Sequence, residues 1–209
     1  MNLRTRRFGI EGPAGNIEML ADEPGEGETL RGTAVIAHPH PLFAGTMDNK
    51  VVQTVARGFV QSRWRALRFN FRGVGASAGT HDEGRGELED MLHIVSSQVP
   101  AGPFALAGFS FGAFVAAAAV VRLWPQREAD KIVLVGTAVS RFTVPELPLD
   151  AQDRTFVIHG ESDDTVSFEA VLDWARPQQL PVTLVPGTGH FFHGQLPLLK
   201  SLVARHLRS

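Results

Sequence analysis

The chain has 209 residues, which fits a single domain spanning residues 1–209. Its hydrophobic fraction of 44% and charged fraction of 20% are typical of a globular protein with a sizeable core, and a formal net charge of −2 argues against a nucleic-acid partner. The sequence contains no cysteine, which excludes disulfides, thiolate metal sites and a cysteine nucleophile.

The N-terminal residues and the apolar runs of the chain bear on the expected cellular location of the protein. The N-terminal residues are basic, but the apolar stretch of a secretory signal does not follow them. The longest apolar run, residues 113–121, is about half of the roughly 18 residues that a membrane span needs, and it predicts a buried helix instead. We therefore expect a cytoplasmic protein without membrane contact, as a monomer or homodimer.

Short apolar segments alternate with helical ones along the chain. Two β-like segments flank residues 13–15 and predict an N-terminal hairpin. Strands are then expected at residues 33–38, 65–70, 103–109, 131–136, 154–160 and 182–187, with helices at about 47–62, 86–98, from 111 onward, 168–175 and in the C-terminal segment. This alternation predicts an α/β fold with a mostly parallel sheet covered on both faces. Active sites of such sheets lie beyond the carboxyl ends of the strands.

The segment GFSFG, residues 108–112, matches Gly-x-Ser-x-Gly between a predicted strand and a predicted helix. In that context the motif makes a sharp turn that lifts the serine clear of the sheet, above a helix N-terminus whose dipole favours developing negative charge. A chance match is the alternative in a chain with 21 glycines. Because the flanking elements are those the motif requires, Ser110 is the candidate nucleophile.

A serine nucleophile needs a base, and the base needs an acid that orients it. With this motif the acid follows the serine in the chain and the histidine comes last. The segment HGESDDTV follows a predicted strand and offers Asp163 as the acid, with Asp164 as the alternative. Asp163 is preferred because of its register in the loop.

The candidate base lies in VPGTGHFFHG, after the last predicted strand. His190 falls in the loop at the strand's carboxyl end, whereas the alternative, His193, is expected on the following helix. His81, His93 and His206 are expected at the surface.

Five segments of the chain, AHPHPLFAGTMDNKVV, RFNFRGVGASAG, GFSFG, HGESDDTV and GTGHFFHG, span it from Thr33 onward. In this order they resemble the small lidless α/β-hydrolases of the dienelactone-hydrolase-like group. The resemblance implies the α/β-hydrolase fold and a serine hydrolase that cleaves small to medium carboxylic esters through an acyl-enzyme, without cofactor or metal. Ser110 stands where true dienelactone hydrolases carry cysteine, so that activity is not implied. A thioesterase, peptidase or acyltransferase with the same triad, or a non-catalytic binding module, remains an alternative.

The resemblance also assigns the segment His38-Pro39-His40-Pro41, where many relatives have His-Gly-x-Pro and use a backbone N–H for the oxyanion hole. Proline has no N–H, so the amide of His40 is the expected donor, and the amide of Phe111 is the second. Metal binding by the two histidines is disfavoured, because no acidic or cysteine cluster accompanies them in the sequence.

The segment between residues 136 and 154, where this fold often inserts a lid, is short, which predicts an open site. An acyl pocket is expected from apolar side chains near the catalytic loops, with ordinary core packing as the alternative for each; the candidates are Leu42, Phe43, Phe109, Phe142 and Phe191.

Overall fold

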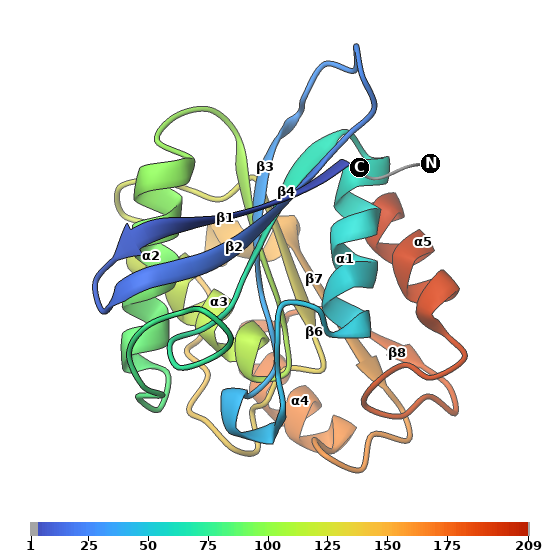
Figure 1. Ribbon diagram of the computed structural model, residues 1–209. Coiled ribbons are helices and arrows are strands. Elements are labelled where there is room, and N and C mark those ends of the chain that lie inside the picture. The colour runs from blue at the N-terminus through green and yellow to red at the C-terminus, as the bar shows by residue number, and fades with distance from the viewer. Residues whose placement is uncertain (1–3, 209) are drawn as a thin grey trace.

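An eight-stranded sheet forms the middle of the protein in the computed structural model, which describes residues 4–208 (Figure 1). The strand order is β1-β2-β4-β3-β5-β6-β7-β8. β1 and β2 form an antiparallel hairpin, β2 pairs antiparallel with β4, and the remaining pairs are parallel. The strands are β1 (Arg4–Gly12), β2 (Gly15–Glu23), β3 (Gly32–Ala37), β4 (Trp64–Phe69), β5 (Phe104–Phe109), β6 (Lys131–Val135), β7 (Thr155–Gly160) and β8 (Val182–Val185).

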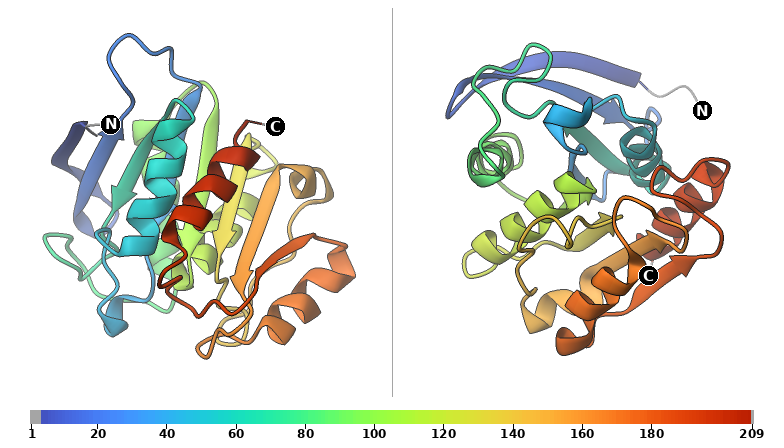
Figure 2. Two further views of the ribbon diagram at one scale, coloured as in Figure 1. Left: turned by 90° about the vertical axis from the view of Figure 1, so that its right-hand side faces the viewer. Right: turned by 90° about the horizontal axis from the view of Figure 1, so that it is seen from below.

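Helices cover both faces of this sheet (Figure 2). One face carries α1 (Lys50–Gln61) and α5 (Leu196–His206), which lie side by side, and the other carries α2 (Arg85–Gln98), α3 (Phe111–Leu123) and α4 (Phe168–Ala175). Three short 3₁₀ helices complete the elements: η1 (Pro41–Phe43), η2 (Leu149–Arg154) and η3 (Arg176–Gln178).

The two faces bury two separate cores because side chains alternate along each strand. In β5 every residue is buried. Leu106 belongs to the core under α2, α3 and α4, whereas its neighbours Ala105 and Ala107 belong to the core under α1 and α5. Because both sets of alternating side chains of such a strand face a core, its sequence is an unbroken apolar run.

The parallel sheet, the helices on both faces and the N-terminal hairpin agree with the sequence expectations, and the differences lie at element ends. The first helix begins at Lys50 and not near residue 47. The side chain of Asn49 accepts the N–H of Val51 at 2.9 Å and caps the helix there. The last strand ends at Val185, two residues before the expected end.

The segment between β6 and β7 packs against the protein and does not form a lid. Val144, Leu147 and Ala151 are buried in the core under α2, α3 and α4. This burial holds the segment down and leaves the carboxyl ends of the strands open. Within residues 4–208, none of the helices combines the length and the apolar character that crossing a bilayer requires.

Candidate active site

Ser110 occupies a sharp turn between β5 and α3. Its backbone has φ 57° and ψ −115°, a conformation that side-chain-bearing residues rarely adopt. The turn is tied to the neighbouring strand, because the Ser110 N–H donates to the Val135 carbonyl at 2.8 Å. This strained turn presents the serine at the carboxyl edge of the sheet, on the N-terminus of a helix of 13 residues.

The glycines on either side of the serine are required by close backbone approaches. A Cβ on Gly108 would lie 2.1 Å from the Gly112 carbonyl oxygen, and a Cβ on Gly112 would lie 2.4 Å from the Ala37 carbonyl oxygen. Both distances are far below any real contact of a methyl group. The spacing of GFSFG therefore reflects the packing of the α3 N-terminus against the end of β3.

Asp163 and His190 form a buried hydrogen-bonded pair at the same edge of the sheet. Nδ1 of His190 lies 2.6 Å from Oδ2 of Asp163. The other carboxylate oxygen, Oδ1, accepts the backbone N–H groups of Thr165 at 2.9 Å and Val166 at 2.8 Å. The loop after β7 therefore fixes the carboxylate, and the carboxylate fixes the imidazole.

The charge of Asp163 determines which nitrogen of His190 carries the proton. Burial raises the pKa of this carboxyl, but the hydrogen bonds from His190 and from the amides of Val166 and Thr165 outweigh it and hold the pKa below its usual value. An ionised carboxylate only accepts hydrogen bonds, so His190 donates from Nδ1. Its Nε2 then carries the lone pair that a general base needs.

The rival residues lie outside this pair. Asp164 is exposed, and its carboxylate accepts only a 3.4 Å bond from the hydroxyl of Thr165 among the described residues. His193 is also exposed and lies in the turn before α5, not on the helix. The structure thus brings the preferred acid and base together, at the strand ends where Ser110 also lies.

The first histidine of HPHP ties two loops together. His38 is fully buried; its Nδ1 donates to the Pro39 carbonyl at 2.6 Å, and its Nε2 accepts the Phe71 N–H at 2.9 Å. Burial lowers its pKa to about 4, so it is neutral at neutral pH. It joins the end of β3 to the chain just after β4.

The second histidine organises the amides of its own loop. The Leu42 N–H donates to His40 Nδ1 at 3.2 Å, and the N–H groups of Phe43 and Gly45 both donate to the His40 carbonyl at 3.1 Å. Among the described residues the His40 amide itself has no acceptor. The Phe111 amide, at the first position of α3, has no acceptor within its helix.

These two amides belong to neighbouring segments. A Cβ on Gly112 would lie 2.5 Å from the His38 carbonyl oxygen, and the rings of His40 and Phe111 are 4.9 Å apart. These contacts bring the HPHP segment next to the start of α3, where the two amides expected to bind an oxyanion lie.

A cavity of about 340 Å³ opens beside Ser110. Aromatic rings form much of its wall: the ring centroid of Phe111 lies 5.1 Å from that of Phe142 and 4.9 Å from that of His40. The residues that line it are His40, Phe43, Glu83, Ser110, Phe111, Ala138, Arg141, Phe142, Thr165 and Val166.

Of the five side chains expected to form an acyl pocket, Phe43 and Phe142 line this cavity. Phe109 is fully buried and packs against His190 at 4.8 Å between rings, while Phe191 is half-exposed and lies 5.1 Å from the same imidazole. Leu42 is 70% exposed and stands outside the cavity wall. Phe109 and Phe191 therefore flank the imidazole of His190.

Several residues near the site are not evident from the sequence. His81 is not at the surface as expected: its side chain is 9% exposed, its Nδ1 lies 2.8 Å from the buried carboxylate of Glu87, and its ring lies 4.7 Å from His40. Glu83 and Arg141 bring opposite charges to the cavity wall from two loops. A positive φ of 55° at Glu83 marks its turn, but nothing in its sequence context predicts it.

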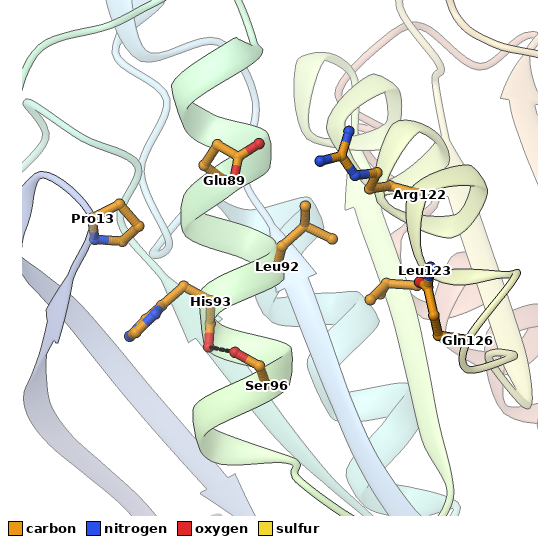
Figure 3. A pocket seen from close by; sticks show the side chains of 8 residues that line it. All are labelled: Pro13, Glu89, Leu92, His93, Ser96, Arg122, Leu123 and Gln126. Atoms are coloured by element: carbon orange, nitrogen blue, oxygen red, sulfur yellow. Dashed lines mark hydrogen bonds between the residues drawn. The ribbon is translucent and has the colours of Figure 1, made fainter.

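Two other hollows lie away from these residues. One of about 380 Å³ lies between α2 and α3, where Leu92 and Leu123 face each other, with Pro13 of the N-terminal hairpin beside it (Figure 3). Another, of about 510 Å³, adjoins the start of α2. Neither is lined by Ser110, Asp163 or His190, so their larger volumes do not make them candidates for the chemistry.

Comparisons with known proteins support the fold. Residues 43–156 match the model of the alpha/beta hydrolase fold family. The structure resembles a lidless α/β serine hydrolase from Xanthomonas campestris, with a TM-score of 0.87 and 32% identity over 100% of this chain and 95% of that one. It also resembles an α/β serine hydrolase homologue from Coxiella burnetii, with a TM-score of 0.84 and 34% identity over 99% of both chains. An uncharacterised protein of Rickettsia prowazekii is 32% identical over 172 residues, covering 76% of this chain and 71% of the relative. The lidless fold predicted from the sequence is confirmed.

Proposed function

This chain belongs to the alpha/beta hydrolase fold family, and from that premise we propose that it is a serine hydrolase that cleaves carboxylic esters of small to medium size. The observation that carries the proposal is the buried 2.6 Å hydrogen bond between His190 and Asp163, at the sheet edge where the strained turn presents Ser110. The two similar structures described as a serine hydrolase and a serine hydrolase homologue support the same chemistry.

In the proposed mechanism Ser110 attacks the ester carbonyl while Nε2 of His190 takes the hydroxyl proton. Asp163 stabilises the imidazolium that forms and remains ionised. The amides of His40 and Phe111 bind the oxyanion of the tetrahedral intermediate. Collapse expels the alcohol, protonated by His190, and a water activated by the same imidazole then releases the acid from the acyl-enzyme.

The cavity beside Ser110 bears on the size of the substrate. A volume of about 340 Å³ lies near the low end of typical ligand pockets, and no lid encloses it. The proposal therefore includes a compact acyl group against the aromatic wall of Phe111 and Phe142, with an alcohol group that projects into solvent. It also includes a cytoplasmic enzyme that acts without a cofactor on a small-molecule ester, as a monomer or homodimer.

The test is covalent labelling with a fluorophosphonate together with turnover of short aryl esters. Ser110→Ala should abolish labelling and lower kcat on the order of 10⁴-fold or more, because triad members act as a unit. Ser140→Ala removes an exposed serine from the loop after β6 and should behave as the wild type. Near-normal turnover by folded Ser110→Ala would disprove the assignment, and a matched series of ester, thioester and amide substrates separates esterase from thioesterase and peptidase activity.

A further inference from the structure

A third histidine, His159, lies behind the Asp163–His190 pair. It sits near the end of β7, four residues before Asp163, and is fully buried. Its Nε2 is 2.8 Å from the carbonyl oxygen of Val166. Because a carbonyl oxygen only accepts hydrogen bonds, the proton of this imidazole resides on Nε2.

The same nitrogen also faces the catalytic carboxylate. Nε2 of His159 lies 3.3 Å from Oδ2 of Asp163, the oxygen that accepts the Nδ1–H of His190. The positive end of the His159 N–H dipole is therefore close to the oxygen that orients the base. Asp163 and His190 are the titratable groups that act on His159.

The contact with Val166 holds the carboxylate from its other side. The N–H of Val166 donates to Oδ1 of Asp163 at 2.8 Å, while its carbonyl accepts from His159. Val166 is thus bound at both its amide and its carbonyl. The chain of contacts runs from His159 through Val166 to Asp163, and from Asp163 to His190.

His159 acts in this chain as a neutral dipole. Its Nδ1 is buried and, within the described part of the chain, has no hydrogen-bond partner. Protonation would place an unpaired N–H in the interior, and burial lowers the pKa of this imidazole below its ordinary value. The neutral ring is therefore favoured, with its one proton on Nε2.

We propose that His159 is a positioning residue of the catalytic triad: its neutral Nε2–H holds the Val166 carbonyl and polarises Oδ2 of Asp163, which sets both the position and the basicity of His190. The inference rests on the proposed function. It differs from ordinary packing in one respect, because an apolar side chain of similar size could fill the same space but could not act on the charge of Asp163.

The test compares His159→Leu, which fills the space without a donor, with His159→Gln, whose amide nitrogen reaches the position of Nε2. His206→Leu is the matched control, since His206 also bonds a backbone carbonyl, that of Arg154, but at the opposite end of β7. For each variant the pH profile of kcat/KM is measured with a neutral aryl ester. The low-field proton resonance of His190 Nδ1–H is titrated in parallel, which reports the pKa of His190 without turnover.

We expect His159→Leu to lower kcat on the order of 10-fold or more with little change in KM, because the base is displaced. The ascending limb of the profile and the His190 titration should both move to higher pH, since a carboxylate without the dipole attracts imidazolium more strongly. His159→Gln should restore most of kcat and the original limb, and His206→Leu should leave both unchanged.

Other results would overturn either the positioning role of His159 or the proposed function. Equal losses in His159→Leu and His159→Gln with an unmoved titration would overturn the proposal in favour of packing, as would wild-type behaviour of folded His159→Leu. If His159→Leu does not fold, His159→Asn replaces it, because its shorter amide cannot reach the position of Nε2. A wild type that hydrolyses no ester, yet shows the shift of the His190 titration between variants, would refute the proposed function and leave the positioning role intact.

Discussion

Mild acid should destabilise this protein through His38, a buried imidazole outside the proposed chemistry. In the native state its Nε2 accepts the Phe71 N–H at 2.9 Å, and its Nδ1 donates to the Pro39 carbonyl. A second proton would have to bind Nε2, where it would set two donors against each other in the interior. Burial therefore lowers the pKa of His38 to about 4, and the bond to Pro39 opposes this only in part.

The sign and size of the effect follow from proton linkage. The unfolded chain has the ordinary histidine pKa of 6.5, so between pH 6.5 and about 4 it binds a proton that native His38 does not. The stabilisation is complete above pH 6.5 and is lost as the pH falls through this window. The free energy of unfolding should decrease by about 1.4 kcal/mol per pH unit there, or about 3 kcal/mol in all. That is a large share of the roughly 5–15 kcal/mol typical of a whole domain.

The assay is urea unfolding at about pH 7.5 and about pH 5, for the wild type and for His38→Gln. Glutamine cannot titrate, so the variant should lose less stability than the wild type on acidification. Its amide oxygen reaches the Phe71 N–H and can accept it, although the variant should be less stable than the wild type at pH 7.5. His206 has a similarly lowered pKa of about 4 owing to its own burial, and His206→Gln measures that separate contribution. If the free energy of unfolding fell equally with pH in the wild type and in His38→Gln, the reasoning would be refuted.

Three further predictions concern the active site. Asp163→Asn should lower kcat by up to about 10⁴-fold, whereas Asp164→Asn should change it less than about threefold; steady-state kinetics of both variants would expose a reversed order. His40→Pro should cost about 10²- to 10³-fold in turnover because the oxyanion amide is lost, whereas His40→Asn keeps the amide and the side-chain cap and should cost about tenfold or less, with circular dichroism as the control for folding. Gly112→Ala should lower the midpoint of thermal unfolding and abolish turnover, since its Cβ would lie 2.4 Å from a carbonyl oxygen of β3, and a stabilised variant would contradict this packing.

The sequence predicts the features of this protein that depend on local pattern. Unbroken apolar strands indicate the parallel sheet, and glycine two residues before and after Ser110 indicates the tight turn, because only glycine permits the approach to the end of β3. The order of serine, acid and histidine then points to the loops after β7 and β8. Each of these inferences needs only neighbours in the chain.

Features that depend on loop shape are less accessible from sequence. Asp163 and Asp164 are adjacent, and what distinguishes them is that the amides of Thr165 and Val166 curl back onto one carboxylate. The cavity wall takes Arg141 and Glu83 from loops far apart in the chain, so no local pattern joins them. The one available signal for a deeper residue was the i, i+4 spacing of His159 and Asp163 across the end of a strand.

The HPHP segment shows how one pattern serves two purposes. His38 directly follows the last residue of β3, and its imidazole binds the backbone inside the protein. Two residues later His40 faces the cavity, where its Nδ1 and its carbonyl engage the amides of its own loop. Burial lowers the pKa of both rings, with the neighbouring His81 adding to the effect at His40. Because the prolines contribute no N–H, the His40 amide is the donor that we propose this segment presents to an oxyanion.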